Sequence, residues 1–144
     1  MTDVVVIDTN VFISALLGPK GPSRQVIRAC LQGQFQPLMG AALFHEYEVV
    51  MGRDVLFGNC RLSVEERTEL LDAFLSVCRW IRVYYLWRPN LRDEGDHHLI
   101  ELAVAGGARY IVTQNLKDLR SGELDFAGLR MISPDALLTG EPER

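Results

Sequence analysis

Hydrophobic and polar residues along this chain alternate between short β-branched runs and longer stretches with helical spacing. Strands are predicted at residues 4–7, 35–39, 80–85, 109–113 and 130–132. Helices are predicted at residues 11–17, 23–32, 41–51, 64–78, 96–105 and from Pro134 onwards. Ser23 is a predicted helix cap, and Ser63 with Glu66 forms a predicted capping box. Strands that alternate with helices indicate an α/β three-layer sandwich with a central, mostly parallel five-stranded sheet.

The composition supports a single folded domain. The chain has 144 residues, 48% of them hydrophobic and 24% charged, which predicts one domain over residues 1–139 and a frayed tail at 140–144. No apolar run is long enough for a membrane span, and no signal peptide is expected. Three scattered cysteines give neither a zinc spacing nor a disulfide framework, so a cytoplasmic protein is expected.

The net charge of −4 argues against a nonspecific nucleic-acid coat protein. It does not exclude a nuclease, because a cluster of metal-binding acids makes a protein acidic by itself. Arg92, Lys117 and Arg120 lie near the expected rim of such a site and are candidates for phosphate contacts. Ordinary solvated surface charge is an equally good interpretation of all three.

Two acidic residues occupy positions that call for an explanation. Asp8 directly follows the first strand, so its carboxylate is expected at the carboxyl edge of the sheet, although it could simply cap the next helix. Glu46 shares a helical face with Leu43 and Val50, whereas Glu48 is rotated towards solvent. A carboxylate on an apolar face is costly unless it is paired or binds a metal. A metal and an arginine partner explain Glu46 equally well.

More polar residues are expected at the same edge. Asp96 lies in the first turn of its helix on the core-facing stripe, where an acid also complements the helix dipole. Asn115 and Asp118 follow the fourth strand, where both residue types are also common turn formers. Together with Asp8 and Glu46, these residues would bring acids from four segments to one place. Crowded carboxylates repel one another, and a hard cation such as Mg²⁺ or Mn²⁺ relieves that repulsion.

With these residues, the sequence resembles the PIN-domain family. The matching segments are residues 6–12, 43–50, 92–100 and 110–119, in the order and spacing of the family. The chain is similar above all to short bacterial and archaeal PIN proteins that are regarded as toxins of toxin–antitoxin pairs. The resemblance implies a metal-dependent ribonuclease that cleaves RNA, forms a homodimer and is blocked by a cognate antitoxin.

The resemblance also implies roles for individual residues. Asp8, Glu46 and Asp96 match the three leading acids of the family and are the expected catalytic residues. The expected metal ligands are Asp8, Asp96, Glu46, Asn115 and Asp118, and the expected supporting residues are Asn10, Asp93 and Thr113. Asn115 departs from the family, where many members carry a fourth aspartate. This departure puts the metal affinity in question.

Several alternatives remain open at this stage. One is a non-catalytic PIN-fold module that binds RNA or protein and whose metal site is weakened by Asn115. A haloacid-dehalogenase-type phosphatase would need a second aspartate where the chain has Asn10, and a receiver domain would need a lysine that is missing. His45, His97 and His98 lack a zinc-site spacing and are expected to be structural rather than catalytic.

Overall fold

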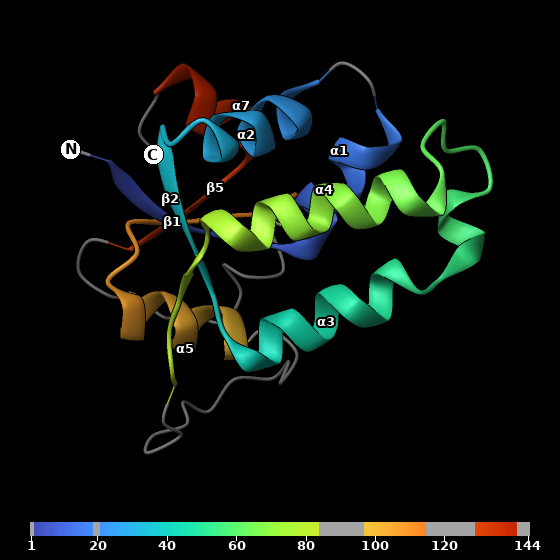
Figure 1. Ribbon diagram of the computed structural model, residues 1–144. Helices are drawn as coiled ribbons and strands as arrows, with labels where there is room; N and C mark the ends of the chain where they lie inside the picture. The colour runs from blue at the N-terminus through green and yellow to red at the C-terminus, as the bar shows by residue number, and fades with distance from the viewer. Residues whose placement is uncertain (1, 19–20, 84–96, 115–128, 141–144) are drawn as a thin grey trace.

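The computed structural model describes residues 2–18, 21–83, 97–114 and 129–140, which form one sheet with helices on both sides (Figure 1). The strands are β1 (Asp3–Ile7), β2 (Phe35–Met39), β3 (Arg79–Trp80), β4 (Tyr110–Val112) and β5 (Arg130–Ile132). The helices are α1 (Thr9–Leu17), α2 (Pro22–Leu31), α3 (Ala41–Met51), the 3₁₀ helix η1 (Asp54–Phe57), α4 (Val64–Val77), α5 (His97–Gly106) and α7 (Pro134–Thr139). Helix α5 lies on one side of the sheet, and α2 and α7 lie on the other.

The order of the strands in the sheet reverses its direction at β1. All pairings are parallel, and the order is β3-β2-β1-β4-β5, so β1 pairs with both β2 and β4. The chain runs outwards from β1 to β3 and then returns past β1 to β4. The order therefore reverses between β1 and β4, and open parallel sheets bind ligands outside the carboxyl ends of strands at such a reversal. The predicted α/β fold with a parallel five-stranded sheet is confirmed.

An aromatic cluster in the core is joined to the carboxyl end of β1. Phe12 of α1, Tyr47 of α3 and Phe74 of α4 are each at most 1% exposed. Their ring centroids lie 5.5 to 6.0 Å apart, which is a favourable range for aromatic pairs. The Tyr47 hydroxyl donates a 2.8 Å hydrogen bond to the carbonyl oxygen of Ile7, the last residue of β1. The cluster therefore joins three helices to the end of the central strand.

The capping prediction is right for one helix and wrong for another. Ser63 and Glu66 form the predicted reciprocal capping box at the start of α4. Helix α2, in contrast, begins at Pro22 with Gly21 as its cap, because proline suits the first helical position. Ser23 therefore lies inside the helix, and its hydroxyl accepts a 3.0 Å hydrogen bond from the side chain of Gln114.

The predicted third strand is much shorter than expected. It was predicted over residues 80–85, but β3 covers only Arg79 and Trp80, and residues 81–83 are not in a strand, whereas residues 84 and 85 lie outside the described residues. In the described part of the chain β3 pairs with β2, which ends at Met39, and Gly40 is the N-cap of α3. The ladder therefore ends with the 2.8 Å bond from the Ile81 amide to the Met39 carbonyl oxygen. In the described ranges, no helix has the length and apolar character needed to cross a membrane.

Candidate active site

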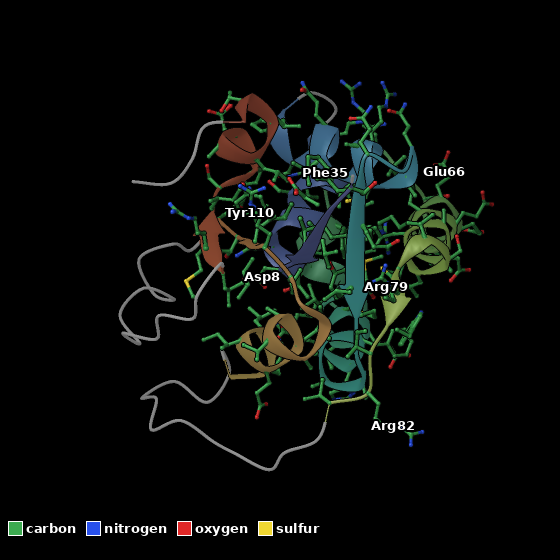
Figure 2. All side chains as sticks on the ribbon, turned by 90° about the vertical axis from the view of Figure 1, so that its left-hand side faces the viewer. Asp8, Phe35, Glu66, Arg79, Arg82 and Tyr110 are labelled. Carbon is green, nitrogen blue, oxygen red and sulfur yellow. The ribbon has the colours of Figure 1, made fainter. Side chains whose placement is uncertain are left out.

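Asp8 lies where the strand order reverses, between the ends of β1 and β4 (Figure 2). Its backbone amide donates a 3.0 Å hydrogen bond to the carbonyl oxygen of Val112, which ties it to β4. Asp8 is also the N-cap residue of α1, but its side chain makes no capping hydrogen bond. The carboxylate is therefore free for another role, and simple helix capping does not explain an aspartate at this position.

One oxygen of the Asp8 carboxylate is held by two neutral donors. The Thr113 hydroxyl donates to Asp8 Oδ2 at 2.8 Å, and Asn10 Nδ2 donates to the same oxygen at 3.3 Å. Asn10 Nδ2 also lies 3.3 Å from the Thr113 hydroxyl oxygen. The side-chain oxygen of Asn10, Oδ1, accepts a 3.2 Å hydrogen bond from the backbone amide of Gln114. These bonds fix the direction in which the carboxylate points and leave Oδ1 facing the rest of the site.

Glu46 reaches the same place from α3, and Thr9 lies between the two acids. The Thr9 hydroxyl is 3.2 Å from Glu46 Oε1 and 3.5 Å from Asp8 Oδ1. A hydroxyl has a single proton, so it can donate to only one of these oxygens at a time. The two carboxylates therefore lie close together and share this hydroxyl as a hydrogen-bond donor. Glu48 is exposed, as its helical position predicts.

The surroundings shift the acidities of the two carboxyls in opposite directions. Burial, reinforced by the negative charge of Glu46, raises the pKa of Asp8, although the Thr113 hydrogen bond partly opposes the shift. The pKa of Glu46 is lowered, chiefly by its hydrogen bond to His98, against the opposing effect of burial. Asp8 is thus the acid that gains most from a nearby positive charge.

His98 contacts the site, a placement that was not predicted from the sequence. Its Nε2 lies 3.0 Å from Glu46 Oε2, and 16% of its side chain is exposed. The other ring nitrogen, Nδ1, is buried and has no hydrogen-bond partner among the described residues. Within the same residues, the partner of Glu46 is a histidine from α5 and not an arginine. The one-turn spacing of His98 and Leu102 on a core-facing helix could have signalled this placement.

Thr9 is the second functional residue that the sequence interpretation overlooked. It was treated only as part of the chain that ends the first strand, yet it is 8% exposed and lies between the two acids. A hydroxyl directly after the strand-end aspartate was the available signal. His45 is exposed on the outer side of α3, as expected for a histidine without a role in the site.

The other predicted site residues lie outside the described residues. They are Asp93, Asp96, Asn115 and Asp118, together with the candidate phosphate contacts Arg92, Lys117 and Arg120 and the side chain of His97. In the part of the chain that the structure describes, no group of three or more histidine, cysteine, aspartate or glutamate residues is placed to hold a metal. The described portion of the candidate active site thus consists of Asp8, Glu46, His98 and the hydroxyl and amide groups that contact them.

Replacing Thr113 with valine tests how Asp8 is held. The change keeps the shape of this fully buried side chain and removes its hydroxyl, so the Asp8 pKa should rise further and the free energy of unfolding at pH 7 should fall by about 1–3 kcal/mol. An NMR titration of the Asp8 carboxyl carbon and denaturant unfolding measure the two effects. Thr68→Val, which removes an exposed hydroxyl on α4, is the control. An unchanged Asp8 titration would contradict the assigned hydrogen bond.

The fold and the site together define a class of protein: a parallel α/β domain with an acidic site at the reversal of its strand order. The sequence gives the family. Residues 4–117 match the family model of the PIN domain. The chain therefore belongs to the PIN-domain family. No curated protein matches the sequence.

Two solved structures share the fold at low sequence identity. One is VapBC2 from Rickettsia felis bound to a DNA fragment from their promoter, with a TM-score of 0.61 and 15% identity over 90% of this chain and 98% of that chain. The other is PAE2754 from Pyrobaculum aerophilum, with a TM-score of 0.64 and 14% identity over 96% of this chain and 88% of that chain. At these identities the comparisons establish the fold.

Proposed function

We propose that this protein is a metal-dependent ribonuclease that hydrolyses RNA phosphodiesters and acts as the toxin of a toxin–antitoxin pair. The observation that carries the proposal is the pairing of Asp8 with Glu46 around one shared hydroxyl at the strand reversal. PIN domains are generally nucleases, and the chain belongs to that family. The toxin role and the antitoxin partner rest on the likeness to VapBC2.

The donors in the site fit a hard divalent cation. Asp8 Oδ1 and Glu46 Oε1 are carboxylate oxygens on either side of the Thr9 hydroxyl, and oxygen is the ligand that Mg²⁺ and Mn²⁺ prefer. Burial and the charge of Glu46 raise the pKa of Asp8, so a cation beside it would favour the ionised carboxylate. Asp8 and Glu46 would hold the ion, and the proposal adds Asp96, Asn115 and Asp118 as further ligands and Asp93 as a supporting acid.

Each residue of the site would have its own role in hydrolysis. A bound cation would supply charge stabilisation for the phosphoryl group and activation of the attacking water. Thr113 and Asn10 orient Asp8, and the Thr113 hydrogen bond favours its ionised form. His98 orients Glu46, keeps it ionised and limits its rotation, so that its other oxygen stays on the side of Asp8. Asp96 completes the proposed set of three catalytic acids.

The test is cleavage of a fluorescent single-stranded RNA by the purified protein. Cleavage with Mg²⁺ or Mn²⁺ that stops in EDTA is expected, together with saturable Mn²⁺ binding in calorimetry. Asp72→Asn, which removes an exposed carboxylate on α4, should behave like the wild type and controls for contaminating ribonuclease when compared with Asp8→Asn. RNA binding with neither cleavage nor Mn²⁺ binding would instead establish a non-catalytic binding module with a weakened metal site.

The partners belong to the same proposal. A cognate antitoxin would block the acids, and a homodimer would use the helices at residues 24–31 and 64–78. Size-exclusion chromatography with light scattering measures the oligomeric state. A monomer at high concentration would contradict the dimer without affecting the proposed chemistry. Cytoplasmic localisation follows from the proposed action on cellular RNA.

A further inference from the structure

A second cavity lies beside the acids, beyond the carboxyl ends of β2 and β3. Its volume is about 400 Å³, within the usual range for small-ligand sites. Three segments line it: the first turn of α3 with its cap, the chain from Trp80 to Val83, and α5 through His98 and Leu102. The same edge of the sheet thus carries the acidic site at its centre and a hollow towards the β3 side.

His98 connects the two sites. One of its ring nitrogens contacts Glu46, and its side chain also lines the cavity. A chain molecule that binds at the acids and extends past His98 therefore reaches the cavity. In a nucleic acid, the group next to a phosphodiester is a nucleoside, so the cavity is placed to receive the neighbouring base.

The chemistry of the lining suits a base. Trp80 is 51% exposed, and its ring is held by a T-shaped, edge-on contact with Phe44 at a centroid distance of 5.6 Å. An exposed, fixed indole is a good surface for stacking an unpaired base. Among the described lining residues there is no carboxylate, and Arg82 is a cation.

Two further residues define the floor and the rim of the cavity. A Cβ atom at Gly40 would lie 3.2 Å from the Leu102 side chain, so the floor is closely packed and the depth of the cavity is set. Arg82 lines the rim, and its side chain extends away from the ribbon into solvent (Figure 2). A cation there could follow the phosphate backbone beyond the base.

We propose that this cavity is a base-binding subsite that stacks one unpaired base of an RNA substrate on Trp80, next to the phosphodiester held at Asp8 and Glu46. The inference rests on the proposed ribonuclease function, which it extends to substrate selection. Because stacking needs a base outside a duplex, the subsite selects single-stranded RNA over paired RNA. Trp80 is a specificity-determining residue in this arrangement, and Glu46 and Asp8 remain the catalytic acids.

The experiment measures RNA binding in a form of the protein that does not cleave. Dye-labelled short single-stranded RNAs with one abasic position, moved along the strand, are titrated against Asp8→Asn protein. The same series is run with Trp80→Ala, Trp80→Phe and Val64→Ala added. Val64 is 61% exposed on α4 and serves as a matched apolar truncation. Thermal unfolding of each variant establishes that it is folded.

The expected result is a coupling between Trp80 and one base. Trp80→Ala should weaken binding of intact RNA by about tenfold, the typical loss for one stacking aromatic, and Trp80→Phe should weaken it less. One abasic position should cause a similar loss in the Trp80 background and almost none in Trp80→Ala. Val64→Ala should keep the full abasic effect. An abasic series that is identical with and without Trp80, or no RNA binding at all, would overturn the subsite.

The outcome separates the subsite from the proposed function. Coupling without RNA cleavage by the wild type would keep the subsite and remove the ribonuclease. RNA cleavage by the wild type without coupling between Trp80 and a base would keep the ribonuclease and remove the subsite. If Trp80→Ala instead abolishes binding of a protein partner while RNA binding is unchanged, the cavity is a protein-docking site and the proposal is wrong.

Discussion

Asp8→Asn is expected to abolish RNA cleavage and, at the same time, to make the metal-free protein more stable. Activity should fall by about a thousandfold or more, the scale for the loss of one essential catalytic group. The stability gain follows from the raised pKa of Asp8, which marks a charge that burial and Glu46 disfavour in the folded state. Asparagine keeps an acceptor for the Thr113 hydroxyl and removes that charge. A gain of about 1 kcal/mol, or about 3–5 °C in Tm, is expected near neutral pH.

The expected difference in stability between Asp8→Asn and the wild type depends on pH. Because the Asp8 pKa is higher in the folded than in the unfolded chain, ionised Asp8 destabilises the fold above its folded pKa, and the penalty declines below that pKa and is gone below the pKa of the unfolded chain. The Tm advantage of the variant should therefore be largest near neutral pH and vanish in acid. Calorimetric scans in EDTA measure it, with Asp72→Asn as the control. A Tm below that of the wild type at pH 7 would contradict the assignment of Asp8 as an uncompensated charge.

The second large effect concerns Tyr47, which joins the core to the site. Tyr47→Ala should lower the free energy of unfolding by about 3–5 kcal/mol, because it leaves a cavity between Phe12 and Phe74. Tyr47→Phe should cost only about 1–3 kcal/mol, since it keeps the ring and leaves the Ile7 carbonyl oxygen without its partner. Denaturant unfolding of both variants measures the difference. Equal losses would show that the hydroxyl, and not the ring, carries the stability at this position.

Most of the fold could be predicted from the sequence because its local signals agree with one another. The β-branched run before Asp8, the capping box at Ser63 and the spacing of Leu43 with Val50 each specify an element that the structure contains. The predicted strand over residues 80–85 failed for a non-local reason. The length of an edge strand depends on its neighbour, and β2 ends at Met39.

The site could be predicted only in part, for a related reason. Asp8 could be predicted as a site residue from its position at the end of a strand, and Glu46 from its position on a helical face. The contacts of His98 and Thr9 depend on how α5 and α1 pack against α3, which no local pattern specifies. Ser23 shows the same limit, because its partner Gln114 is 91 residues away in the sequence.

The hydrogen bond between Asp8 and Thr113 spans 105 residues of sequence. Ribosomes make proteins from the amino end, so the aspartate emerges early, whereas the hydroxyl that orients it emerges late. β1 also cannot pair with β4, its second neighbour, until translation has passed Val112. A nascent chain that has not reached Thr113 therefore cannot complete the hydrogen bonds that orient Asp8. The topology makes the formation of the site depend on translation of β4 and of the residue after it.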